Sequence, residues 1–357
     1  MIEPTTSKRR QRPTTGRVTI DDVANRAGVS IKTVSRVLND EPNVRPATRA
    51  RVEQAVRELD YSPNPSARGL AGTRSRMIGL IYVNPSPNYL FQAISGVLQG
   101  CEAAGYGLSL QAPEPDDPGL ADNITRFVRQ SRVDGVLLIP PIGDVTAVLD
   151  SLEEIGMPYA RIAPLDGRPG VGVSVDDRLA SSRVVEHLVG LGHTRIGFIE
   201  GHPAHGASHA RLEGYRLGLA RAELAFEPEL VVSGRFDAES GRRAAAHFLG
   251  MKNPPTAIFA SNDEMAAGLM QVALKQQWPI PERISVAGFD DTPLSRNIWP
   301  SLTTVRQPIR PMALRATELL LDLIDQRGEA QAAADASRIE LFEAPLIVRA
   351  TTGPVAR

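Results

Sequence analysis

The sequence predicts a small all-α domain at the N-terminus, followed by a larger α/β domain made of two lobes, each a doubly wound parallel sheet. Two observations lead to this prediction. Apolar residues recur at helical spacing in three short blocks between residues 18 and 59, and after residue 76 short β-type runs alternate with amphipathic stretches. Such alternation is typical of βαβ units, and about 270 residues of it exceed what one sheet usually holds.

The charge of the chain is divided unevenly along its length. The 357 residues carry 40 Lys and Arg against 41 Asp and Glu, and this net charge of −1 taken alone argues against a nucleic-acid partner. Residues 1–76, however, hold 15 basic and 8 acidic residues, whereas the remaining 281 residues hold 25 and 33. A basic head of net +7 therefore precedes an acidic body of net −8.

Cysteine content and hydropathy indicate the compartment. Cys101 is the only cysteine, which excludes an intramolecular disulfide framework and a zinc site built from several cysteines. No apolar run of about 18 residues occurs, and no apolar segment of a signal peptide follows the basic start. We expect a soluble, cytoplasmic protein that is not exported and has no membrane partner.

The N-terminal part divides into three segments. Residues 1–17 carry almost nothing that could be buried, so we expect a disordered basic arm. Residues 18–63 are predicted to form a helix-turn-helix domain. Residues 64–76 are rich in Pro, Ser, Gly and Arg and are predicted to be a linker with little stability of its own.

Local signals place the first two helices of the head. Thr19 and Asp22 form a capping-box variant that starts the first helix, and Gly28 is suited to the left-handed conformation that ends it. Ser30 is placed to cap the second helix, over residues 31–38.

The second helix has a core face and an outer face. Val34, Val37 and Leu38 are expected in the core. The outer side chains, which would meet base edges in a major groove, are Ile31, Lys32, Ser35 and Arg36. A generic three-helix domain with exposed basic residues is the alternative.

Ten short apolar runs in the body are predicted strands. They are residues 77–83, 106–110, 135–139, 158–162, 171–175, 196–199, 230–232, 257–260, 284–287 and 303–305. We divide the body, residues 77–357, into an N-terminal lobe of about residues 77–175 and 306–337 and a C-terminal lobe of about residues 176–305 and 338–353. The Ala-rich stretch 330–336 is expected to be a surface connection.

No catalytic motif is found in a convincing context. The sequence has no phosphate-binding loop, no HExxH, no GxSxG and no GxGxxG that opens a helix after a strand. His202, His205 and His209 could suggest a metal, but Gly and Pro place the first two in an irregular loop, and no nearby Cys or carboxylate completes a site. We expect a solvated loop at the rim of a cleft, with neither metal nor cofactor.

The head resembles that of the lactose-repressor (LacI/GalR) family of bacterial transcription regulators. The resemblance is carried by residues 18–24 (VTIDDVA) and 27–39 (AGVSIKTVSRVLN), and it continues through residues 61–64 (YSPN) and 67–71 (ARGLA) to residues 346–349 (LIVR). It covers nearly the whole chain after residue 17. It implies a hinge helix after the head and a body like a periplasmic binding protein.

The resemblance implies DNA-binding roles for ten residues: Thr19, Ile31, Lys32, Thr33, Ser35, Arg36, Asn43, Asn64, Arg68 and Leu70. Arg36 is suited to a bidentate contact with guanine, whereas Ile31 offers apolar contact, for instance to a thymine methyl group. Leu70 corresponds to the hinge leucine that is pushed between base pairs from the minor groove. The alternative is that Leu70 only packs beneath the linker.

Two lobes without a catalytic set predict a cleft that closes on a small ligand at the carboxyl ends of the strands. In the family, the motifs that contain Arg211, Asn262 and Asp290 carry effector ligands. An Arg, an amide and a carboxylate together suit a polyhydroxylated ligand. Taken singly, these residues could instead be the partner of a surface acid, a helix cap and a turn residue.

Three further residues are candidates for the effector site. Tyr89 falls where the family places an aromatic side chain over the ligand and could stack on a sugar ring. Trp299 could line the cleft or pack at the hinge. Arg161 stands where some members carry an acidic residue for the sugar, which leaves room for an acidic sugar, an oligosaccharide or a phosphorylated ligand.

The sequence thus predicts a DNA-binding repressor that acts as a homodimer on a pseudo-palindromic operator, with a sugar effector in the cleft. We expect the dimer face around the helix over residues 90–104 and the strand over residues 77–83. A solute-binding receptor that feeds a transporter is the alternative, but it would need an export signal and no basic head. An enzyme on a two-lobe α/β fold is the third hypothesis.

Overall fold

The computed structural model describes residues 18–38, 44–61, 74–84, 86–114, 117–165, 167–326 and 338–355. Two compact units divide the chain, residues 1–75 and residues 76–357. The expected basic arm lies outside the described residues, as do the Ala-rich stretch 330–336 and residues 64–73 of the linker.

The first unit contains the three predicted helices of the head, α1 (Ile20–Ala27), α2 (Ile31–Leu38) and α3 (Pro46–Glu58). The Thr19 hydroxyl accepts a hydrogen bond from the Asp22 amide, and the Asp22 carboxylate accepts one from the Thr19 amide, as predicted. Gly28 ends α1 with a φ of 61°, and the Ser30 hydroxyl accepts from the Thr33 amide at the start of α2. The three helices share one core through their apolar stripes.

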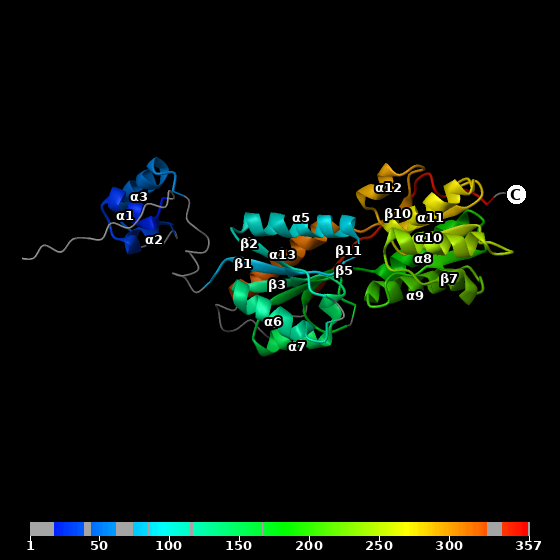
Figure 1. Ribbon diagram of the computed structural model, residues 1–357, viewed down its shortest axis with the longest axis horizontal. Coiled ribbons are helices and arrows are strands. Elements are labelled where there is room, and N and C mark those ends of the chain that lie inside the picture. The colour runs from blue at the N-terminus through cyan, green and yellow to red at the C-terminus, as the bar shows by residue number, and fades with distance from the viewer. Residues whose placement is uncertain are drawn as a thin grey trace, which may run out of the picture. The chain divides into compact units, whose positions relative to one another are not determined.

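The first lobe of the second unit is a six-stranded parallel sheet in the order β11-β5-β4-β3-β1-β2. Its strands are β1 (Met77–Ile81), β2 (Gly107–Gln111), β3 (Gly135–Leu138), β4 (Tyr159–Ile162), β5 (Val171–Val175) and β11 (Arg338–Phe342). Helices α5 (Pro87–Ala103) and α13 (Ile309–Gln326) cover one face, and α6 (Leu120–Ser131) and α7 (Thr146–Glu154) cover the other, with a short turn η1 (Ile142–Asp144) before α7 (Figure 1).

The second lobe is a six-stranded sheet in the order β12-β10-β9-β8-β6-β7, in which only β12 runs antiparallel to its neighbour. Its strands are β6 (Ile196–Ile199), β7 (Val231–Val232), β8 (Ala257–Ala260), β9 (Ser285–Asp290), β10 (Thr303–Arg306) and β12 (Leu346–Ile347). Helices α8 (Asp177–Gly190) and α9 (Gly206–Arg221) pack on one face, and α10 (Ala238–Leu249) and α11 (Asp263–Lys275) on the other. The short elements η2 (Pro228–Leu230) and α12 (Pro293–Asn297) complete the lobe.

The chain crosses between the lobes three times: after β5, after β10 and between β11 and β12. The predicted lobe boundaries need one correction, because residues 338–342 were assigned to the C-terminal lobe. These residues form β11, which pairs in parallel with β5 along its whole length and adds an edge strand to the first sheet. Among the described residues, no helix is long and apolar enough to span a bilayer.

Candidate functional site

A cavity of about 40 Å³ lies between the two lobes. Its walls are formed by Asn84, Ser86, Tyr89, Pro140, Ala163, Asp177, His205, Ala207, Arg211, Phe236, Asn262, Asp290 and Gln307. Most of these residues follow the carboxyl ends of strands in both sheets, where open α/β sheets bind ligands. The enclosed space is large enough for a few water molecules.

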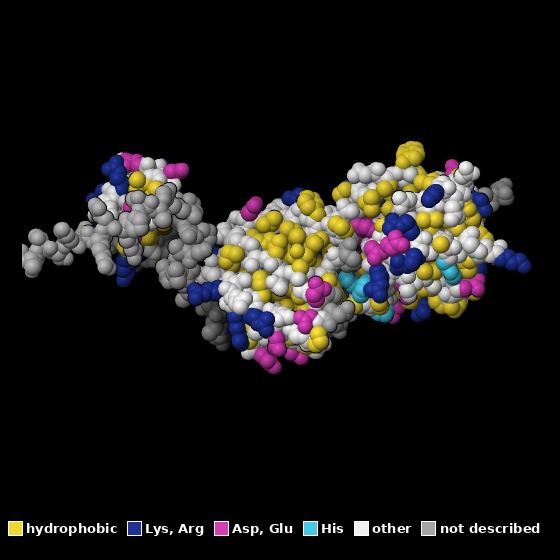
Figure 2. Space-filling model, viewed as in Figure 1, with side chains coloured by type: hydrophobic (Ala, Val, Ile, Leu, Met, Phe, Trp, Pro, Cys, Tyr) yellow, Lys and Arg dark blue, Asp and Glu magenta, His cyan; other side chains and the backbone are white. Residues whose placement is uncertain are grey.

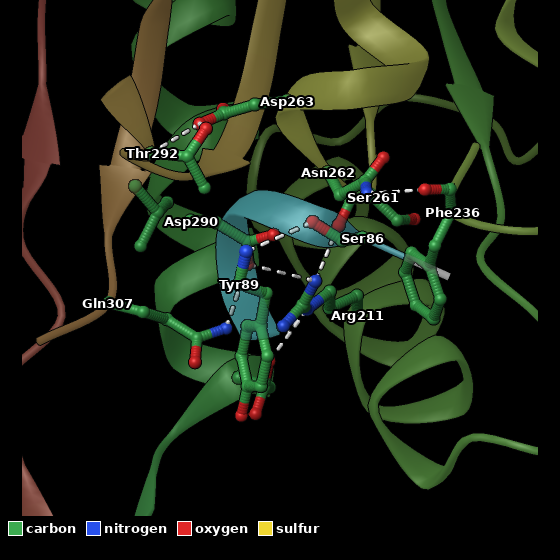
Figure 3. Close-up of polar contacts among 12 residues, drawn as sticks. Ser86, Tyr89, Arg211, Phe236, Ser261, Asn262, Asp263, Asp290, Thr292 and Gln307 are labelled. Atoms are coloured by element: carbon green, nitrogen blue, oxygen red, sulfur yellow. Dashed lines mark hydrogen bonds and ion pairs between the residues drawn. The ribbon is translucent and has the colours of Figure 1, made fainter. Parts of the chain in front are cut away.

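Arg211, on α9, is the centre of the polar network in the cavity wall. Its Nε donates to Asp177 Oδ1 at 2.7 Å, its Nη1 donates to the carbonyl oxygen of Ser261 at 2.5 Å, and Nη1 lies 3.7 Å from Asp290 Oδ1. The guanidinium also stacks 3.7 Å from the ring centroid of Phe289. Arg211, Asp290, Gln307 and Tyr89 converge on the cavity in Figure 3.

The two acids beside Arg211 are fully buried. Burial raises the pKa of Asp177, and the neighbouring Arg211 guanidinium lowers it by a smaller amount. Burial also raises the pKa of Asp290 well above its ordinary value, against the same lowering by Arg211. Asp290 Oδ1 accepts a hydrogen bond from Gln307 Nε2 at 3.1 Å, which ties the end of β9 to the segment after β10.

Asn262 caps helix α11 and also faces the cavity. Its Oδ1 accepts from the Met265 amide at 2.9 Å, and its Nδ2 donates to the carbonyl oxygen of Phe236 and to Glu264 Oε2, both at 2.9 Å. The helix-cap role that the sequence left open is therefore present, and it holds the amide at the site. The adjacent Asp263 is buried away from the cavity and accepts from Thr292 and Thr304, and burial raises its pKa to about 7.

Hydrogen bonds to Glu264, on α11, join the lobes at the edge of the cavity. Its Oε1 accepts from Ser86 Oγ at 2.6 Å and from Asn88 Nδ2 at 3.1 Å, and both donors belong to the first lobe. Glu264, Ser86, Asp177 and Gln307 were not predicted as site residues. Asp177 could have been found, because it opens a helix directly after the predicted strand 171–175.

The structure brings Tyr89, Arg211, Asn262 and Asp290 together around the cavity, as predicted. It does not bring Arg161 or Trp299 there. Arg161 donates to the carbonyl oxygens of Gly143 and Arg168, because its neighbours Ala160 and Ile162 occupy the opposite face of β4. Trp299 is 84% exposed and is not part of the cavity wall.

The predicted solvated histidine loop also needs correction. His205 is buried against Phe236 and lines the cavity, and burial lowers its pKa to about 4, so that it is neutral. Among the described residues, no three His, Cys, Asp or Glu side chains are grouped to hold a metal ion.

On α2 the side chains divide as the sequence predicts. Val34 and Val37 are buried, Lys32 and Arg36 are exposed, and Ile31 is 46% exposed despite being apolar. Ser35 is half-buried, the Thr33 hydroxyl pairs with that of Ser30, and Thr19 is engaged in the capping box. The other predicted DNA contacts lie outside the described residues: Asn43, Asn64, Arg68 and Leu70.

Comparisons with known proteins agree with both units. Residues 19–64 match the model of bacterial regulatory proteins of the lacI family, and residues 185–352 match a periplasmic binding protein-like domain. The chain is 33% identical to the probable HTH-type transcriptional repressor ExuR of Bacillus subtilis over 87% of its own length and 92% of the relative's. It is 35% identical to the HTH-type transcriptional regulator GalR of Escherichia coli over 87% and 90%, respectively.

Two solved structures are also similar. The lac repressor dimer bound to operator and the anti-inducer ONPF superimposes with a TM-score of 0.81 at 29% identity, covering 94% of this chain and 99% of the repressor chain. A complex of the transcriptional regulator CelR with cellobiose superimposes with a TM-score of 0.70 at 28% identity, covering 94% of this chain and 100% of the CelR chain.

Proposed function

The chain belongs to the lacI family of bacterial regulatory proteins, and on that premise we propose that it is a transcriptional repressor whose operator affinity is controlled by a small-molecule effector. The observation that carries the proposal is the pairing of two sites on one chain. One is a helix that exposes Ile31, Lys32 and Arg36, and the other is a cavity built around Arg211. We assign no enzymatic activity to the chain, whose named relatives are transcriptional repressors and regulators, and we place its action in the cytoplasm.

For the head, we propose that α2 reads base edges in the major groove. Arg36 is suited to guanine, and the exposed Ile31 to a thymine methyl group. Thr19, Thr33, Ser35, Asn43, Asn64 and Arg68 are proposed to contact the DNA backbone or to support the reading helix. Leu70 is proposed to unstack the central base step, which favours a pyrimidine–purine step at the operator centre.

For the body, we propose a sugar as the effector. Asn262, Asp290, Gln307 and Arg211 offer donors and acceptors side by side, as paired hydroxyl groups require, and Tyr89 offers a ring face. The relatives include a ribose operon repressor and a regulator bound to cellobiose. Arg161, the residue that left room for an acidic or phosphorylated ligand, does not line the cavity, which supports a neutral sugar.

We further propose that the repressor is a homodimer on a pseudo-palindromic operator, as in the solved lac repressor dimer. Figure 2 shows hydrophobic side chains gathered on the first lobe, where Phe91 and Leu98 of α5 and Leu110 of β2 are 69%, 40% and 47% exposed. The strand predicted for this face, residues 77–83, is β1, which pairs with β2 and β3 on its two sides. We therefore assign β2, the edge strand, to the face in its place.

The DNA-binding part is tested by fluorescence anisotropy with genomic fragments at increasing salt. One fragment is expected to bind preferentially, with an affinity that falls steeply as salt rises. Arg36→Ala is expected to cost about 1–3 kcal/mol on that fragment and to relax its sequence preference. Arg57→Ala, an equal charge change at an exposed site on α3, should leave the preference unchanged. Binding of all fragments with one affinity would refute the proposal.

The effector part is tested by a thermal-shift panel of ribose, galactose, glucose and cellobiose, because a ligand that binds only the folded state raises the melting temperature. A sugar that raises it should also change operator affinity, and Asp290→Ala should abolish that change while DNA binding persists. An intact response in Asp290→Ala would remove Asp290 from the site.

A further inference from the structure

An ion cluster in the second lobe is centred on the buried carboxylate of Asp291, whose side chain is 1% exposed. Asp291 Oδ2 accepts from Arg306 Nε at 2.7 Å, and Oδ1 accepts from Arg349 Nη2 at 2.5 Å and from Ser295 Oγ at 2.8 Å. Burial alone would raise the pKa of Asp291, but the hydrogen bonds from Arg306, Arg349 and Ser295 outweigh it and hold the pKa below its ordinary value. The carboxylate is therefore charged and bonded on both oxygens.

The two arginines with the shortest contacts belong to the chain segments on the second-lobe side of two crossings. Arg306 is the last residue of β10, immediately before the chain passes to α13 in the first lobe. Arg349 lies two residues after β12 (Leu346–Ile347), the strand with which the chain re-enters the second lobe from β11. The Arg306 amide also donates to the carbonyl oxygen of Pro345 at 2.8 Å, so the two crossing segments are bonded to each other where they meet the second lobe.

The same turn joins this cluster to the cavity. Asp290, which lines the cavity, precedes Asp291 directly, and the two residues have φ values of 109° and 50°. The φ of Asp291 lies in the left-handed region that aspartate tolerates, whereas 109° lies outside it, so the surrounding contacts must hold Asp290 there. Gln307, which follows Arg306, bonds to Asp290 through its side chain and through its backbone amide. The side chain of Asp290 thus lines the ligand cavity, and the side chain of the next residue, Asp291, binds the arginine that ends β10 and the arginine that follows β12.

We propose that Asp291, Arg306 and Arg349 form a hinge clamp, a positioning cluster that fixes the direction in which two crossings leave the second lobe. The clamp transmits a displacement of Asp290 to the angle between the lobes. This proposal deepens the proposed function and rests on it, because it names the device that links the effector site to operator affinity.

The structure supplies a matched pair of variants for the test. Arg306 and Arg296 are both about half exposed, at 49% and 54%, and both pair with Asp291 Oδ2, at 2.7 and 3.8 Å. Only Arg306 lies at a crossing, because Arg296 belongs to α12 within the second lobe. Arg306→Ala should therefore disturb the lobe angle, whereas Arg296→Ala should not.

The lobe angle is measured without ligand, on the full chain, by the distance between spin labels at Glu154→Cys on α7 and Lys275→Cys on α11, both exposed positions. Cys101 is buried and stays in place. We expect a broader and displaced distance distribution for Arg306→Ala and an unchanged one for Arg296→Ala. Arg306→Lys keeps a donor for Asp291 and is expected to restore most of the original distribution.

A second readout is the change in operator affinity caused by ribose, galactose, glucose and cellobiose. Arg306→Ala should reduce the largest such change by about fivefold or more, within the usual range of coupling between sites. Equal distance distributions for Arg306→Ala and Arg296→Ala, or no restoration by Arg306→Lys, would overturn the clamp. If no sugar changes the affinity of the unaltered protein, the effector proposal fails, while the distances still decide the clamp.

Discussion

Replacing Arg211 by Met tests most directly whether this arginine compensates the buried acids of the cavity wall. The change removes a buried guanidinium and keeps an unbranched apolar side chain in its place. It deletes the bond to Asp177 at 2.7 Å, the bond to the Ser261 carbonyl and the stacking on Phe289. Asp177 and Asp290 then remain buried without their positive partner.

The expected cost follows from that burial. Removal of one partner of a buried ion pair costs about 3–5 kcal/mol, because the remaining charge is no longer compensated. A folded domain is stable by about 5–15 kcal/mol, so the variant should fold but with a large share of its stability lost. Arg221, on the same helix, pairs with Glu186 at the surface, with side chains 49% and 42% exposed, and Arg221→Met should cost less than about 1 kcal/mol.

The pH dependence provides a second signature. Arg211 lowers the pKa of both acids against the larger effect of burial, so its removal raises the pKa of each in the folded state. The folded state then binds protons that the unfolded state releases, and the free energy of unfolding falls as pH rises above about 4, the ordinary value of aspartate. The variant should therefore be less impaired at about pH 5 than at about pH 8.

The assay is urea unfolding followed by fluorescence of Trp278, which is buried in the second lobe. The quantity compared is the free energy of unfolding of the two variants and the unaltered protein at both pH values. A loss of stability in Arg211→Met no larger than in Arg221→Met, or an equal loss at both pH values, would contradict the electrostatic role of Arg211.

Two further predictions concern the body. Burial raises the pKa of Asp263 from 3.8 to about 7, so this group makes the free energy of unfolding fall as pH rises across that interval, and Asp263→Asn should flatten the profile measured by urea titration. A Cβ on Gly96 of α5 would lie 2.3 Å from the Arg310 carbonyl oxygen of α13, so Gly96→Ala should lower the free energy of unfolding by about 1–3 kcal/mol. At Gly190 of α8, an added Cβ would have no atom within 4 Å apart from its chain neighbours and the backbone of its own helix, so Gly190→Ala should raise the free energy of unfolding by up to about 1 kcal/mol. Equal effects of the two substitutions would contradict the close approach of α5 and α13.

Where local signals and burial agree, the sequence was sufficient to predict the structure. The capping box at Thr19 and the left-handed Gly28 depend on a few neighbouring residues, and both are present. The parallel strands were recognisable because burial on both faces requires continuous apolar runs, as in β8 and β9. The place of Asp290 and Asn262 at the cavity was predictable in the same way, since the carboxyl ends of β8 and β9 meet at one edge of the sheet.

The predictions that failed depend on long-range packing. β11 alternates apolar and charged residues and is half exposed, so its place beside β5 is decided by pairing across more than 160 residues of chain. Arg161 was assigned to the ligand because it stands where some family members carry an acidic residue, but the face of β4 that its side chain occupies depends on register. Trp299 is bulky and apolar but stands 84% exposed, which no local pattern indicates.

The geometry of the cavity also determines which ligand contacts can shift the equilibrium between open and closed lobes. Arg211 is already balanced by Asp177 and Asp290, and all three belong to the second lobe together with Asn262, so a ligand held by these residues alone would bind open and closed lobes equally. A ligand shifts a conformational equilibrium only by its difference in affinity for the two states. Contacts that span the cleft, to Asn84, Ser86 or Tyr89 of the first lobe, must supply that difference. A typical coupling of about 1–3 kcal/mol corresponds to one to three hydrogen bonds. Substitutions at Asn84 and Tyr89 should therefore reduce the response to effector more than they reduce its binding, and substitutions at Asn262 should reduce both together.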